Sequence, residues 1–96
     1  MGQFARARRL FSALTALDPG DVHARCCLAH ACIRLEDGEA ALHTLTGLAP
    51  GDPIPGGDAI LHLLLARAHT LSGDDMAARE AVAAFWKARR SGGEEQ

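Results

Sequence analysis

The chain has 96 residues, a formal net charge of −2 at pH 7 and 48% hydrophobic residues. This length allows one small domain, and the slightly acidic balance argues against nucleic acid as the main ligand. Three cysteines form no disulfide framework, which fits a reducing cytosol, and no apolar run reaches the ~18 residues that a membrane-spanning helix needs.

The first predicted element is an amphipathic helix over residues 4–17. Its apolar residues recur at the three-and-four spacing of one helical face: Phe4, Ala7, Leu10, Phe11, Leu14 and Leu17. Arg6, Arg8 and Arg9 interrupt any apolar run, so no signal peptide is expected. Proline disfavours helical backbone in the residue before it, so Asp18-Pro19 ends the helix.

Four further helices are predicted, with no strand. In chain order they span 21–35, 39–48, 58–72 and 75–90. Asp21 and Asp58 are expected to cap the helices that they precede, and the proline-rich segment 50–57 cannot be helical. The predicted domain is therefore 1–90, and the tail 91–96 is expected to be disordered.

The sequence also repeats itself. The segment that begins at Leu28-Ala29 is parallel to the segment that begins at Leu65-Ala66, and a shortened third copy opens the chain. Ala7 and Ala41 are 34 residues apart. A period of this size with helical patterning is typical of an array of paired helices, which binds other proteins and rarely catalyses a reaction.

The repeated positions resemble the tetratricopeptide repeat (TPR). The leucine and small residue of helix A are found at Leu28-Ala29 and Leu65-Ala66. In helix B, the small residue is Ala7, Ala41 and Ala78, and the bulky residue that follows it is Phe11, Leu45 and Val82. The closing proline is found at Pro19 and Pro53. The resemblance implies an all-α TPR-like solenoid of about two and a half repeats. Two positions depart from the pattern: Arg25 and His62 replace a large aromatic residue, and Cys32 and His69 replace a tyrosine.

The order and lengths of the pieces resemble one branch more closely, the small TPR chaperones of bacterial type III secretion (the YscY/SctY family). The matching pieces are Leu17-Asp18-Pro19, Arg25-Cys26-Cys27, Gly38-Glu39, Asp52-Pro53 and Ala68 to Asp74. The resemblance implies a cytoplasmic chaperone that needs no cofactor. Its client would be a small secreted protein of the YscX/SctX type, and the pair would dock on the export gate at the inner membrane. The alternative is a general TPR scaffold with an unrelated client.

The repeat register predicts a groove lined by the A helices. Its predicted lining is His23, Cys26, His30, Ile33 and Arg34 from one repeat and Ile60, Leu63, Arg67, Thr70 and Leu71 from the next. Apolar side chains mixed with two arginines suit a helical or extended peptide, since arginine satisfies carbonyls and acids. The competing interpretation is that Ile60, Leu63 and Leu71 complete the core.

A second partner surface is predicted on the first helix. The family pattern places one more helix before Gly2, and this sequence contains none. We therefore expect Phe4, Phe11 and Leu14 to form an apolar surface, covered by a partner chain or, without client, by a second copy in a homodimer.

Other kinds of site have weaker support. His23, Cys27 and His30 follow one helical stripe beside Cys26, but zinc sites usually draw ligands from two segments, so no metal is predicted. His43, His62 and His69 have no nucleophile in a recognisable motif, and Cys26-Cys27 lacks the spacing of a redox pair. We therefore predict no catalytic residue and no enzymatic activity.

Overall fold

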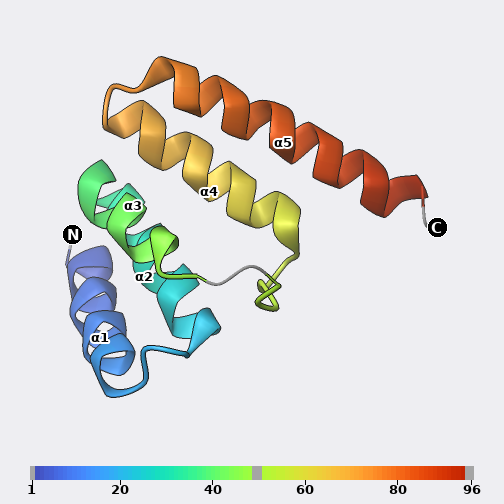
Figure 1. The fold of residues 1–96 in the computed structure, drawn as a ribbon. Coiled ribbons are helices and arrows are strands. Elements are labelled where there is room, and N and C mark those ends of the chain that lie inside the picture. Colours follow the sequence, from blue (N-terminus) through green and yellow to red (C-terminus); the bar gives the residue numbers. More distant parts are fainter. Residues whose placement is uncertain (1, 49–50, 95–96) are drawn as a thin grey trace.

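The computed structural model describes residues 2–48 and 51–94, with the backbone alone over 91–94. This part of the chain contains five helices and no strand: α1 (Gln3–Leu17), α2 (Val22–Arg34), α3 (Gly38–Thr46), α4 (Asp58–Leu71) and α5 (Asp75–Glu94). Successive helices pack side by side, and α1 and α5 lie at opposite ends of the array (Figure 1). The all-α fold is thus confirmed. None of the helices described combines the length and hydrophobicity needed to cross a bilayer.

The helix boundaries agree with the predicted ones to within two residues except at the end of the last helix, and one predicted cap is wrong. Asp58 does not cap α4 but is its first residue, because the N-cap is Gly57 at a φ of 90°, with no side-chain cap bond. The last helix runs to Glu94, so the first four residues of the expected disordered tail are helical. The last two residues of that tail lie outside the described part of the chain.

The two helical hairpins turn in the same way, as the repeat predicts. Asp37 Oδ1 accepts a hydrogen bond from the Ala40 N–H at the start of α3, and Asp74 Oδ1 accepts one from Ala77 at the start of α5, each at 3.1 Å. A carboxylate at this position satisfies a backbone donor that the first helical turn leaves free. The residue before each aspartate is left-handed, Glu36 at φ 61° and Gly73 at φ 81°.

The core lies between α2, α3 and α4. Its buried members are mostly small: Ala29, Cys32, Ile33, Ala41, Leu45, Leu64 and Ala68. Ala29 and Ala41, at repeat positions of α2 and α3, are fully buried, which lets these helix backbones approach closely. All three cysteines lie on α2, with Cys32 fully enclosed, Cys26 buried and Cys27 half-buried.

Gly38 marks the point where α3 meets the end of α4. A Cβ built on this glycine would lie 2.8 Å from the Ala68 carbonyl oxygen, 2.8 Å from Leu71 Cβ and 2.7 Å from Ser72 Oγ. No side chain fits at this distance. The glycine therefore permits the contact that joins the first three helices to the last two.

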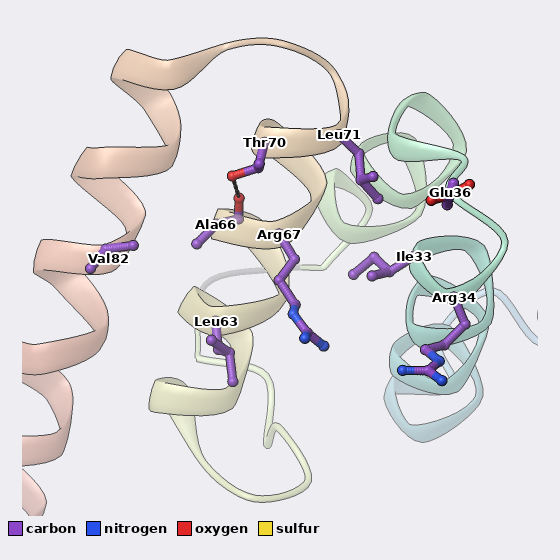
Figure 2. A pocket seen from close by; sticks show the side chains of 9 residues that line it. All are labelled: Ile33, Arg34, Glu36, Leu63, Ala66, Arg67, Thr70, Leu71 and Val82. Atoms are coloured by element: carbon purple, nitrogen blue, oxygen red, sulfur yellow. Dashed lines mark hydrogen bonds between the residues drawn. The ribbon is translucent and has the colours of Figure 1, made fainter.

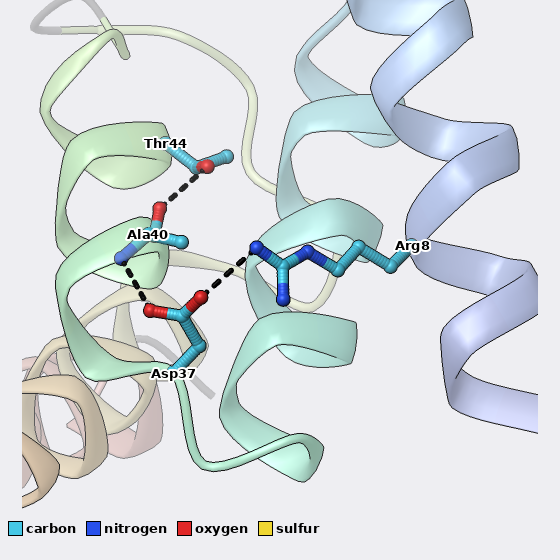
Figure 3. Close-up of polar contacts among 4 residues, drawn as sticks. All are labelled: Arg8, Asp37, Ala40 and Thr44. Atoms are coloured by element: carbon cyan, nitrogen blue, oxygen red, sulfur yellow. Dashed lines mark hydrogen bonds and ion pairs between the residues drawn. The ribbon is translucent and has the colours of Figure 1, made fainter.

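Two arginines tie the first helices together. Arg8 of α1 donates from Nη2 to Asp37 Oδ2 at 2.9 Å, so the carboxylate that caps α3 also binds α1 (Figure 3). The hydrogen bond from Ala40 and the Arg8 guanidinium lower the pKa of the Asp37 carboxyl below its ordinary value. Arg25 of α2 donates to the carbonyl oxygens of Thr44, at 3.2 Å, and Pro19, at 3.0 Å. These bonds explain why arginine can replace the aromatic residue of the repeat pattern there.

Candidate functional site

A groove of about 500 Å³ lies between the C-terminal end of α2 and one face of α4 and reaches α5. Its lining residues are Ile33, Arg34, Glu36, Leu63, Ala66, Arg67, Thr70, Leu71 and Val82 (Figure 2). Hydrogen bonding within α4 shapes one wall, since Thr70 Oγ1 donates to the Ala66 carbonyl oxygen at 2.9 Å. The groove is open to solvent, so it suits an extended ligand better than an enclosed small molecule.

The apolar part of the groove has side chains from three helices. Ile33 of α2 is buried at its base, and it points toward α4 in the close-up view (Figure 2). Leu63 and Leu71 of α4 are each about two-fifths exposed, as is Val82 of α5. Leu63 and Leu71 thus remain accessible, so they do not simply complete the core.

Two guanidinium groups give the groove its positive charge. Arg67 extends between α4 and α2 (Figure 2) and, within the described part of the chain, has no hydrogen bond or ion pair. Arg34 lies over the ring of Phe4, with Cζ 5.0 Å from the ring centroid. This cation–π contact holds one groove arginine against α1. Glu36 provides the one carboxylate among the lining residues described.

Six of the ten predicted groove positions come together here: Ile33, Arg34, Leu63, Arg67, Thr70 and Leu71. The other four lie outside. Cys26 is buried, and His23 lies 3.7 Å from the Cys27 sulfur. Ile60, in the first turn of α4, packs next to Gly56, which precedes that helix. His30 turns toward α1, where its ring lies edge-on to Phe4 with centroids 6.2 Å apart.

Sequence reasoning missed Glu36, Ala66 and Val82. The repeat pattern assigns Val82 to packing within the last helix pair, and its partial exposure depends on the angle between α4 and α5. Ala66 is the small residue of the helix A pair, so only its role in close packing was expected. Glu36 belongs to the turn, and its position at the rim follows from the left-handed backbone there.

The predicted surface on α1 requires a correction. Phe4 and Phe11 are half-buried, and Phe4 contacts His30 and Arg34 of α2. Leu14, the third residue of the predicted surface, is exposed and forms an apolar face with Leu10 and Leu17. The reason is that α2 covers the aromatic side of α1 and leaves the leucine side open.

The histidines and cysteines make no further site in the described part of the chain. No group of three or more His, Cys, Asp or Glu side chains there is arranged to hold a metal ion. Burial raises the pKa of the thiols of Cys26, Cys27 and Cys32, whereas a reactive cysteine needs a lowered pKa. His69 Nδ1 is buried without a hydrogen-bond partner among the described residues.

Comparisons with known proteins bear on this arrangement. The family model described as tetratricopeptide repeat matches residues 1–53, which include α1, α2 and α3. Searches of curated proteins and of solved structures found no significant match.

Proposed function

The chain belongs to the tetratricopeptide repeat family, and we propose that its groove binds a segment of another protein. Proteins of this family generally serve as scaffolds for protein–protein interaction and not as enzymes. The observation that carries the proposal is that one open groove combines exposed leucines with the Arg67 guanidinium, which has no partner among the described residues.

The groove chemistry favours an amphipathic segment with acidic side chains. Leu63, Leu71 and Val82 offer apolar contact area, while Arg67 can bind a carboxylate or a backbone carbonyl oxygen through its fork of donors. A client segment with apolar side chains on one side and carboxylates on the other would thus make both kinds of contact at once. Binding would also stabilise the fold as client concentration rises, as mass action requires.

For the identity of the client, we propose a small type III secreted protein of the YscX/SctX kind. The support is the resemblance in the order of the sequence motifs, from Leu17-Asp18-Pro19 to the turn at Asp74. In this role the chain would act as a cytoplasmic chaperone and deliver its client to the export gate. A general TPR scaffold with another client is the alternative.

The groove is tested with the double variant Leu63→Glu with Arg67→Glu. We expect it to lose co-purification with the client while its helix content, measured by circular dichroism, remains unchanged. The matched control is Met76→Glu with Arg90→Glu, which makes the same charge change on exposed residues of α5 outside the groove. Equal binding by the groove variant and the parent would rule out the groove.

The client is tested by co-expression with the YscX/SctX-type protein of the same genome. Stoichiometric co-purification that the groove variant abolishes would support the chaperone role. If a different protein from the native cytosol binds in the same variant-sensitive way and the secreted protein does not, the general scaffold is correct.

A further inference from the structure

The outer face of α1 carries a leucine stripe that the groove does not use. Leu10, Leu14 and Leu17 are 56%, 38% and 83% exposed, and their spacing of four and then three residues places them on one side of the helix. Single exposed leucines are ordinary. Three of them in one stripe form an apolar face that no other helix of the described chain covers (Figure 1).

The charges on α1 are separated along its length. Arg6 and Arg9 lie exposed in the N-terminal half, and neither has an ion pair within the described residues. No acidic residue occurs between Gln3 and Leu17. Asp18, at the C-cap, is exposed, and among the described residues its carboxylate accepts a hydrogen bond only at Oδ1, from the Gly20 N–H at 3.1 Å. The helix therefore has a positive and a negative end beside its leucine stripe.

We propose that this face binds the same face of a second copy of the chain, with the two α1 helices antiparallel. A two-fold axis near Ser12 would bring Arg6 level with Asp18 of the second copy, and Leu10 level with Leu14. Ala7, a small residue, would lie level with Leu17. A parallel pairing would instead place arginine beside arginine, so the charges specify the direction.

The expected interface is small. A helix of 15 residues is ~22 Å long, and a single helix pair buries less than the ~1,200 Å² of a stable complex. The dimer should therefore be reversible and depend on concentration. The stripe and the groove lie on different elements, because α1 contributes no groove residue, so this inference goes beyond the proposed function.

The first test is sedimentation velocity of the full chain over a dilution series from micromolar to near-millimolar. We expect monomer at low concentration and dimer at high concentration. Leu17→Glu should weaken the dimer about tenfold or more, because a charge replaces a buried apolar contact. The control is Met76→Glu, on α5, since Met76 is similarly exposed at 75%, and it should leave the dimer unchanged.

The second test addresses the direction of the helices. Arg6→Asp and Asp18→Arg should each weaken the dimer, and the double exchange should restore it. Circular dichroism of each variant checks that the fold is kept, and Leu10→Glu replaces Leu17→Glu if the latter loses helix content. A monomer at every concentration would overturn the proposal, as would a dimer that Leu17→Glu and Leu10→Glu leave intact or that Met76→Glu disrupts. Failure of the double exchange to restore binding would overturn the antiparallel pairing.

Discussion

The first three helices and the last two are held together by different kinds of contact. Directional polar bonds cross between the early elements: Arg8 of α1 binds Asp37, and Arg25 of α2 binds the Thr44 and Pro19 carbonyls. Between α4 and α5 no polar side-chain bond is found among the described residues. The small side chain of Ala78 in α5 is buried and lets these two helices pack closely instead.

This difference shows how one position of the repeat pattern can accept different residues. The family model matches the first half of the chain, although the aromatic position there is occupied by Arg25. The two hydrogen bonds from Arg25 to carbonyl oxygens connect α2 to the neighbouring segments, a role that a large ring would otherwise fill by packing. In the second half, His62 has the equivalent place without such bonds among the described contacts, and close helix packing must supply the stability.

The largest expected effect comes from Gly38, where the two regions meet. Gly38→Ala would force its new Cβ against the Ala68 carbonyl and Leu71 Cβ, and we expect a loss of about 1–3 kcal/mol in the free energy of unfolding. Urea unfolding measures this change. Gly20→Ala is the control, since its nearest neighbour would lie at an ordinary 3.5 Å. Equal stability of Gly38→Ala and the parent would show that α3 and α4 are not held at this distance.

Substitutions at the two equivalent turns should change the stability of the fold in opposite directions. Gly73→Ala puts a Cβ on a residue at φ 81°, with open space around it, so the cost is conformational and about 1–2 kcal/mol. Glu36→Gly removes a strained side chain at φ 61° and should stabilise the chain by up to about 1 kcal/mol. Thermal unfolding measures both. If both substitutions destabilise, the two turns do not share one backbone geometry.

The smallest expected effect concerns the charge on Asp37. Asparagine caps a helix as well as aspartate does, so Asp37→Asn removes mainly the exposed ion pair with Arg8, and we expect a loss of about 0.2–1 kcal/mol at neutral pH. Asp74→Asn is the control, because it changes the equivalent cap, which has no arginine partner within the described residues.

The same variant tests the pH dependence of the first region. The lowered pKa of Asp37 means that its contribution to stability is complete above the unfolded-state pKa and is lost as the pH falls through the folded-state value. Between about pH 5 and pH 2, the parent should therefore lose more stability than Asp37→Asn. Parallel curves for the two proteins would show that the carboxylate is not stabilised by the fold.

The helices could be predicted because their signals are local. Apolar spacing, the proline after Asp18, the capping residue Asp21 and the turn at Asp37-Gly38 act within one or two helical turns. The prediction that Asp58 caps α4 was wrong, because the chain enters this helix through a left-handed glycine and does not use the aspartate as its cap. The period of the repeat then indicated which helices pair.

The site was predictable only in part, because it depends on how neighbouring helices cover each other. The register correctly places Ile33 and Leu63 on facing helices. It does not reveal that the start of α1 lies beside the C-terminal half of α2, where Phe4 contacts His30 and takes it away from the groove. The orientation of α1 likewise decides that Phe4 packs inward and Leu17 outward, and both residues satisfy the same helical spacing.

The reactivity of the cysteines of α2 can report local opening of the fold around this helix. Cys27 is accessible in the folded state, whereas Cys32 is enclosed by the core residues around Ala41 and Leu45. Thiol alkylation at Cys32 therefore requires α2 to separate from its neighbours, and the ratio of the two labelling rates reports how often this occurs. Such labelling, done with and without client, would follow the opening of the first region without a foreign probe.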